Sequence, residues 1–251
     1  MAVLASTCAM LTACGTDAHK TADPQRSDSA TSTPAQLGST ASVAQAAPQT
    51  IVPIGDVPGN PDAVRAIQPW ARDLVADDLD RLIRNCWTID PARAREMYSD
   101  KAGILAALAQ TGRDGQFTVS WSGPTEAVHL YRDEIASGYA CPRVAPTGSD
   151  TTLDEADARY ALHRYLARRT GSPVHPQDTE HKYRLLCLGS PLADNPGKLN
   201  GITVFDERKS ALEPTDSYGY KIQVPVSSTR AQSVTFTLSI GSTGYCVNDA
   251  N

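Results

Sequence analysis

The residue types best suited to chemistry gather in one short segment of this sequence. Residues 175–181 hold two imidazoles and two carboxylates, from His175, Asp178, Glu180 and His181. Such groups can ligate a metal ion, or can pair as a general base and the acid that orients it. Prolines in and beside the segment equally predict an exposed polar loop whose histidines face water. Because metal sites usually draw ligands from distant segments as well, we assign no metal here and keep His175, Asp178 and His181 as candidate ligands.

A group of aromatic residues is the second candidate site. Tyr218 and Tyr220 alternate with Gly219 and Lys221, so both rings lie on one face of a predicted strand, and Phe236 lies on a second predicted strand. These three aromatic rings are the candidates for lining a ligand pocket. Packing within a core is the more ordinary role of aromatic residues in such a pattern.

The sequence carries none of the common catalytic or nucleotide-binding signatures. GxSxG, SxxK, HExxH, the P-loop and GxGxxG are all absent. A triad assembled in space needs no local motif, so a hydrolase that uses His175 and His181 is kept as a third hypothesis. We assign no catalytic residue and expect no cofactor. A formal net charge of −5 gives no reason to expect a nucleic-acid partner.

The cysteines predict a covalent framework. Six are present, and four of them lie in the part of the chain that contains aromatic residues. In an exported protein, four well-separated cysteines predict two disulfide bonds, for which three pairings exist. No CxxC pair occurs, which argues against a zinc site. We favour the pairing in which each bond closes one half of the domain, with a loop of roughly 55 to 60 residues that contributes about 4 kcal/mol. The favoured bonds join Cys86 to Cys141 and Cys187 to Cys246.

The first residues of the chain indicate where the protein resides. An apolar run over residues 2–13 ends in the tetrapeptide LTAC, whose cysteine is Cys14. A transmembrane helix needs about 20 apolar residues, so this run is too short to span a bilayer. The segment resembles the signal peptide and lipobox of bacterial lipoproteins, although no Lys or Arg precedes the apolar run as in most signal peptides.

The resemblance implies an anchored protein. It implies that residues 1–13 are removed as a signal peptide and that Cys14 receives acyl chains, palmitate among them. Two or three acyl chains hold a protein stably at a membrane. We therefore expect the lipid on Cys14 to hold the protein at the outer face of the cytoplasmic membrane.

The segment after Cys14 has the composition of a tether. Ala, Ser, Thr, Pro, Gln and Asp dominate residues 14–59, and the first aromatic residue of the chain is Trp70. Such a segment buries too little apolar surface to offset the entropy of ordering it. We expect a disordered tether over residues 14–59 and a single α+β extracytoplasmic domain over residues 60–251.

Helical spacing of apolar residues marks the beginning of that domain. Pro69 is placed to begin a helix that runs to Cys86. Its solvated face carries Asp80 and Arg84, which have the spacing of an i,i+4 ion pair. A charged stripe of this kind is the ordinary exposed face of a helix.

Four further helices are expected. The clearest covers residues 152–170, where Thr152 and Glu155 have the spacing of a capping box and Gly171 follows as the stop. The other starts follow the usual helix signals. They are Asp90-Pro91, Ser99, and a segment over residues 125–137.

The second half of the domain changes to a period of two, which predicts strands. The alternating segments are residues 183–187, 218–226 and 234–240, and residues 227–232 are short enough for a hairpin between the last two. The predicted fold class is therefore α+β, with N-terminal helices packed on a C-terminal antiparallel sheet and disulfide bonds as staples.

This order of elements resembles the nuclear transport factor 2-like superfamily. The residues that carry the resemblance are the helix starts at Asp90 and Ser99 and the paired strands from Tyr218 and Val234. The resemblance implies a pocket and no particular chemistry, because that superfamily includes enzymes, carriers and scaffolds.

The sequence therefore predicts a membrane-anchored extracytoplasmic lipoprotein that acts as a binding or assembly module with an unidentified protein partner. The alternative is a carrier that holds a small apolar ligand in a pocket between sheet and helices.

Overall fold

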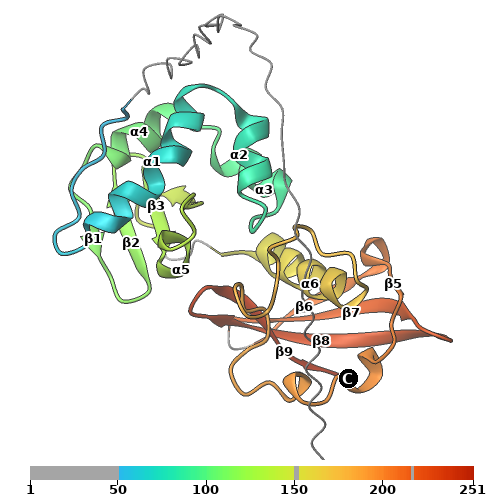
Figure 1. Cartoon of the computed structure of the whole chain (residues 1–251). Coiled ribbons are helices and arrows are strands. Elements are labelled where there is room, and N and C mark those ends of the chain that lie inside the picture. Colours follow the sequence, from blue (N-terminus) through green and yellow to red (C-terminus); the bar gives the residue numbers. More distant parts are fainter. Residues whose placement is uncertain (1–50, 150–152, 216–217) are drawn as a thin grey trace, which may run out of the picture. The chain divides into compact units, whose positions relative to one another are not determined.

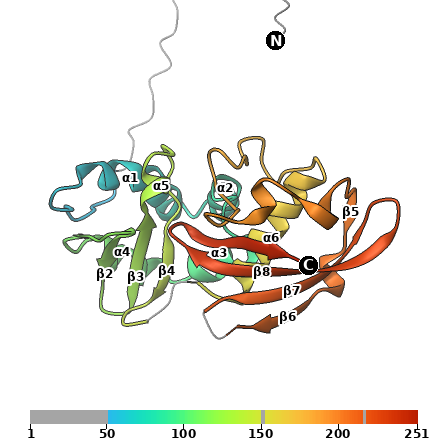
Figure 2. The same cartoon turned by 90° about the horizontal axis from the view of Figure 1, so that it is seen from below.

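Two hydrophobic cores organise the part of the chain that the structure describes. The computed structural model describes residues 51–149, 153–215 and 218–251 (Figures 1 and 2). The predicted signal peptide, Cys14 and most of the predicted tether lie outside these residues. The described residues all belong to one compact unit.

The first core lies between four helices and a four-stranded antiparallel sheet in the order β1-β2-β3-β4. Its largest fully buried side chains include Trp70 and Trp121. Figure 2 shows β2, β3 and β4 side by side. The elements are α1 (Pro61–Val75), α2 (Leu79–Asn85), α3 (Pro91–Met97), α4 (Lys101–Leu108), β1 (Arg113–Asp114), β2 (Thr118–Ser122), β3 (Glu126–Tyr131), α5 (Arg132–Ile135) and β4 (Arg143–Pro146).

Each of the first four helices begins at a polar residue that caps it. The side-chain oxygen accepts a hydrogen bond from a backbone N–H of the first turn, and this N–H has no partner within the helix. The capping residues are Asn60, Asp78, Asp90 and Asp100.

The second core lies between α6 and a five-stranded antiparallel sheet. Helix α6 lies across one face of this sheet (Figure 1). The strand order is β5-β7-β8-β9, and β6 also pairs with β7. The elements are α6 (Glu155–Arg169), η1 (Pro191–Ala193), η2 (Gly197–Leu199), β5 (Val204–Phe205), η3 (Glu207–Lys209), β6 (Ala211–Pro214), β7 (Tyr220–Ser227), β8 (Ala231–Gly241) and β9 (Gly244–Ala250).

The hairpin of β7 and β8 follows from the alternation in the sequence. Ile222 pairs with Phe236 and Val224 with Val234, and all four side chains are buried. In an antiparallel pair, directly opposite residues point to the same face, so one apolar face forms across both strands. That face packs against α6.

Both predicted disulfide bonds are present with the favoured pairing. Cys86 is bonded to Cys141 and Cys187 to Cys246, with Cα atoms 5.5 Å and 5.0 Å apart. The first bond joins the end of α2 to the residues before β4. The second joins the loop after α6 to β9. The predicted fold class, α+β with antiparallel strands and disulfide staples, is confirmed.

The first sheet was not predicted, and one expected helix belongs to it. Residues 125–137 form strand β3 and the four-residue α5 in place of a longer helix. Strand β3 pairs along its length with β2, so that Trp121 lies opposite Val128. Cross-strand packing of buried side chains outweighs a local sequence that suits either structure.

Several predicted boundaries also move. Pro69 lies inside α1, whose first helical residue is Pro61, and the helix expected at Ser99 is capped by Asp100. Val52 and Val57 are buried in the first core, so the ordered chain begins before residue 60.

Two more corrections concern the second half. Helix α6 is capped by Asp154, whose capping box is completed by Asp157, and Thr152 lies outside the described residues. Gly171 ends the helix as expected, with φ +76°. Residues 183–187 form no strand, and only Leu186 makes an isolated bridge, to Val247. Within the described ranges, no helix has the length and apolarity to cross a bilayer.

Candidate functional site

A cleft of about 1130 Å³ opens beside α6. Its volume is slightly above the usual range of small-molecule sites, roughly 300–1,000 Å³. Side chains from α2, the start of α3, α6, residues 174–175, η3 and β7 line it. The second and first halves of the chain therefore both contribute to its walls.

The floor of the cleft is apolar. Leu162 of α6 and Ile222 and Val224 of β7 line it, and all three belong to the second core. We call these three residues the apolar floor. Their positions follow from the helix packing on the sheet, so the floor is part of the fold and is present without a ligand.

Aromatic rings form one wall of the cleft. The rings of Trp87 and His175 stack with centroids 4.7 Å apart and planes 9° from parallel. The Tyr160 hydroxyl donates to the Trp87 carbonyl at 2.8 Å, and Tyr160 stacks on His163 at 5.8 Å. These contacts join residues after α2, a loop and α6 into a single aromatic wall.

A histidine and a carboxylate are paired at the cleft. His163 Nδ1 donates to Glu207 Oε2 at 2.8 Å, and the His163 ring meets the edge of Phe205 at 5.6 Å. The hydrogen bond that His163 donates to Glu207 raises the pKa of His163 above its usual value, because it favours the charged imidazolium more than partial burial disfavours it. The bond through Nδ1 leaves Nε2 as the ring nitrogen available to a ligand.

This pair does not assemble into a hydrolytic triad. A serine in the same cleft, Ser210, accepts a hydrogen bond from Arg159 Nη1 at 2.6 Å. Among the described residues no hydrogen bond joins Ser210 to His163, which binds Glu207 instead. The arrangement is suited to binding.

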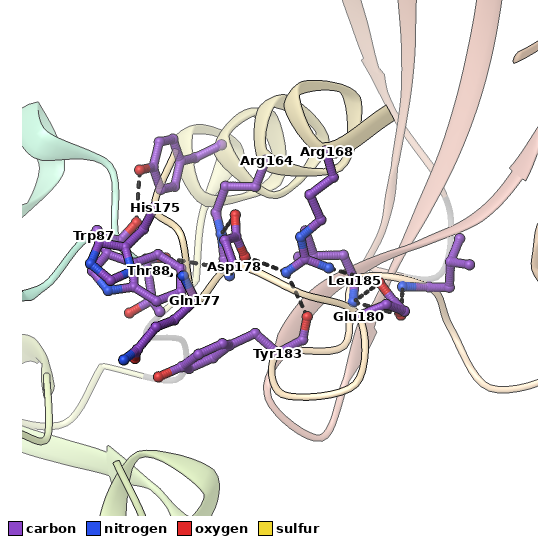
Figure 3. A network of polar contacts seen from close by, with 12 residues as sticks. Trp87, Thr88, Arg164, Arg168, His175, Gln177, Asp178, Glu180, Tyr183 and Leu185 are labelled. Carbon is purple, nitrogen blue, oxygen red and sulfur yellow. Dashed lines mark hydrogen bonds and ion pairs between the residues drawn. The ribbon is translucent and has the colours of Figure 1, made fainter. Parts of the chain in front are cut away.

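The predicted histidine loop is fixed to α6 by buried ion pairs (Figure 3). Asp178 is 2% exposed, and Arg164 donates to both of its oxygens, from Nη2 at 2.7 Å and from Nε at 3.3 Å. Arg168 Nη2 also binds the Asp178 carboxylate. Burial alone would raise the pKa of Asp178, but the hydrogen bonds from Arg164 and Arg168 outweigh it and hold the pKa below its usual value.

The second carboxylate of the loop, Glu180, also binds groups of the protein. Glu180 accepts from Arg168 Nη1 at 2.8 Å and from the backbone N–H groups of Leu185 and Leu186. Arg164 in addition lies over the Trp87 ring, with its guanidinium carbon 5.1 Å from the centroid. Arg164 therefore contacts both the loop and the aromatic wall.

These contacts correct the expectation of an exposed polar loop. Asp178 is buried, His175 is half-buried against Trp87, and only His181 faces water as predicted. Within the described part of the chain, no group of three His, Cys, Asp or Glu side chains is arranged to hold a metal ion. The hydrolase that was to use His175 and His181 also loses its nearby acid, because the Asp178 carboxylate is occupied by two arginines.

The three aromatic residues predicted to line a pocket do not line this cleft. Tyr218 is 86% exposed and adopts φ +55°, so it belongs to the turn before β7. Tyr220 packs against Tyr245 at 5.6 Å, and Phe236 is fully buried beside Tyr165. Core packing accounts for Phe236, as the alternative interpretation held.

A second perturbed carboxyl group has a structural role. Glu134 is buried and accepts from Thr88 Oγ1 at 3.1 Å and from the Cys141 backbone N–H at 3.3 Å. Burial raises the pKa of Glu134 to about 7. The adjoining hollow of about 50 Å³ is too small for more than water.

The cleft residues were largely missed by sequence reasoning. Trp87, Tyr160, Arg159 and Glu207 carry no motif, and His163 was noticed only as a neighbour of the histidine loop. A signal existed in α6, where Arg159 and His163 lie four residues apart and so share a face. The partners on η3 and β7 are set by tertiary structure alone.

Comparison with known proteins gives no relative. No family model, no curated protein and no solved structure matches this chain.

Proposed function

We propose that this protein is a lipid-anchored extracytoplasmic binding protein whose domain holds a small ligand in the cleft beside α6. The observation that carries the proposal is the cleft of about 1130 Å³ over an apolar floor. Of the two roles predicted from the sequence, the carrier with a pocket between sheet and helices fits this geometry better than an assembly module. A protein partner stays a prediction.

The lining supports a ligand with both apolar and polar parts. The half-buried aromatic wall offers apolar surface, whose burial contributes about 25 cal/mol per Å². The apolar floor closes the cleft from below and is itself at most 1% exposed. Arg84, Arg159 and His163 stand among the lining residues and can orient a polar end. Ligand sites commonly combine a largely apolar lining with a few placed polar groups.

The anchor rests on the N-terminal sequence. The LTAC tetrapeptide at Cys14 and the tether-like composition that follows support lipidation and an outer-face location. The resemblance to the nuclear transport factor 2-like superfamily stays a prediction that rests on the order of the elements.

Binding of a neutral apolar dye tests the cleft. We choose Nile red, whose fluorescence increases when it leaves water, and a variant that fills the cleft. Ala156 is an exposed residue of α6 that lines the cleft, so Ala156→Trp adds bulk there without removing a buried contact. Ala106→Trp is the matched control, because Ala106 is an exposed residue of α4 outside the cleft lining.

The expected result is saturable Nile red binding to the wild type and to Ala106→Trp, with affinity reduced about tenfold or more in Ala156→Trp. Circular dichroism establishes that both variants are folded. Equal binding by the wild type and Ala156→Trp, or no saturable binding by any of the three, would overturn the proposal.

A further inference from the structure

The two carboxylates that line the cleft are both engaged by groups of the protein. Asp90 caps α3 and accepts hydrogen bonds from the backbone N–H groups of Ala92 and Arg93, at 2.9 Å and 3.0 Å. Glu207 accepts from His163 at 2.8 Å. Asp90 is thus engaged by backbone donors and Glu207 through Oε2, while Glu207 Oε1 is buried and has no hydrogen-bond partner among the described residues.

The arginines of the lining are less completely engaged. Asp80, the predicted partner of Arg84, instead binds Arg95 at 3.5 Å, and Arg84 makes no ion pair with any described residue. Arg159 pairs through Nε with Glu155, whose side chain is 53% exposed, and donates from Nη1 to Ser210 Oγ at 2.6 Å, so its Nη2 is the nitrogen left for a ligand. Arg84 and Arg159 therefore keep donors that a ligand can use.

The two histidines add donors of the same kind. The backbone N–H of Gln177 donates to His175 Nδ1 at 3.2 Å, so the proton of a neutral His175 ring lies on Nε2. His163 binds Glu207 through Nδ1, and the same bond favours its protonated form, in which Nε2 also donates. Apart from Glu207 Oε1, the groups that these contacts leave available are donors, on Arg84, Arg159 and the two histidines.

We propose that the ligand of the cleft is an amphiphile with an anionic headgroup, a carboxylate or a phosphate, whose apolar tail lies against the aromatic wall. Arg84, Arg159 and His163 bind the headgroup. Arginine suits this role because its planar fork matches the oxygens of both anions. This inference rests on the proposed function and specifies the chemistry of the same site.

Four amphiphiles with the same ten-carbon chain separate the headgroup from the tail. They are decanoate, decyl phosphate, decanol and decyltrimethylammonium, each used below its critical micelle concentration. Their affinities for the purified full chain are measured by isothermal titration calorimetry. Decanoate and decyl phosphate are both negatively charged but have different headgroups. Their relative affinities therefore distinguish a carboxylate ligand from a phosphate ligand.

The variants are chosen to remove one cation at a time. Arg84→Gln and Arg159→Gln remove cleft charges, and Arg84→Lys keeps a charge on α2. Arg169→Gln is the matched control, because Arg169 is an exposed residue of the same helix as Arg159 and lies outside the lining. A charge-assisted hydrogen bond lost in either cleft variant should weaken binding of the anions about tenfold.

The outcomes separate this inference from the proposed function. Tighter binding of decanoate or decyl phosphate than of decanol, lost in Arg84→Gln and Arg159→Gln but kept in Arg169→Gln and largely kept in Arg84→Lys, supports both. Decanol or decyltrimethylammonium binding as tightly as the anions, or anion binding unchanged in both cleft variants, overturns the anionic headgroup and leaves the cleft as a binding site. Failure of all four amphiphiles together with Nile red overturns the proposed function as well.

Discussion

Asp178 Oδ1 lies 2.7 Å from Arg164 Nη2 in the interior of the protein, and this ion pair fixes the loop after α6 to the helix. The loop carries His175 against Trp87, and Trp87 lines the cleft. The shape of the aromatic wall therefore depends on a buried ion pair that does not itself line the cleft.

Replacing Asp178 by Ala should destabilise the protein by about 3–5 kcal/mol. The substitution leaves Arg164 and Arg168 without their buried carboxylate, and removing one partner of a buried ion pair is costly. His181→Ala in the same loop should change stability by no more than about 0.5 kcal/mol, since that side chain is exposed. Urea unfolding of both variants measures the difference, and a small, equal effect for the two would contradict the buried network.

The two disulfide bonds should contribute unequally although their loops are similar. The cysteines are 55 and 59 residues apart, so chain entropy predicts about 4 kcal/mol for each bond. Cys86 and Cys141 are also buried in the first core, whereas Cys187 is half-buried. Substituting both cysteines of the first bond by Ala should therefore lower stability more than substituting both of the second. Peptide mapping without reduction gives the connectivity directly, and four free thiols in the native protein would refute it.

The sequence predicts the elements around the histidine loop but not the buried ion pairs of Asp178. Spacing alone predicts α6 and the hairpin of β7 and β8, because each has one apolar face at the period of its own structure. Export and an even number of cysteines predict the disulfide bonds. The burial of Asp178 could not be predicted, because it depends on two arginines that face the loop only once α6 has packed.

The candidate site likewise consists of residues that are far apart in the sequence. His163 and Glu207 are 44 residues apart, and Tyr160 and Trp87 are 73 apart. Only tertiary structure brings these residues together. The segment with the densest chemistry, residues 175–181, proved to be mainly a structural support, since its carboxylates bind α6 arginines.

The contribution of the His163–Glu207 pair to the free energy of unfolding should decrease as the pH rises. Because Glu207 raises the pKa of His163, the folded state binds this proton more tightly than the unfolded state, whose value is near 6.5. The contribution is fully present below about pH 6.5 and is lost as the pH rises through the folded pKa. The stability difference between wild type and His163→Gln should therefore be larger at pH about 5.5 than at pH about 8.5.

Groups that face His163 from other elements act on the same titration. Asp90 before α3 and Asp178 in the loop both favour the charged imidazolium, as Glu207 does. NMR titration of the ring protons in Glu207→Gln should show a lower His163 pKa than in the wild type. An unchanged or higher value would contradict the hydrogen bond as its main cause.

Lipid on Cys14 should be detectable by metabolic labelling. Cells supplied with a labelled fatty acid should label this protein, and Cys14→Ala should abolish the label because the acceptor thiol is lost. Cys8→Ala is the matched control, since Cys8 lies within the predicted signal peptide. Label that persists in Cys14→Ala, or that is lost in Cys8→Ala alone, would contradict the lipobox interpretation.

Native mass spectrometry of the protein extracted from membranes tests the central claim most directly. The account predicts that the wild type and Ala106→Trp carry a bound small amphiphile in near-stoichiometric amount, and that Ala156→Trp, with its cleft filled, carries little or none. Wild-type protein that is free of ligand when gently extracted, or Ala156→Trp protein that carries the same ligand in the same amount, would contradict a binding function for the cleft.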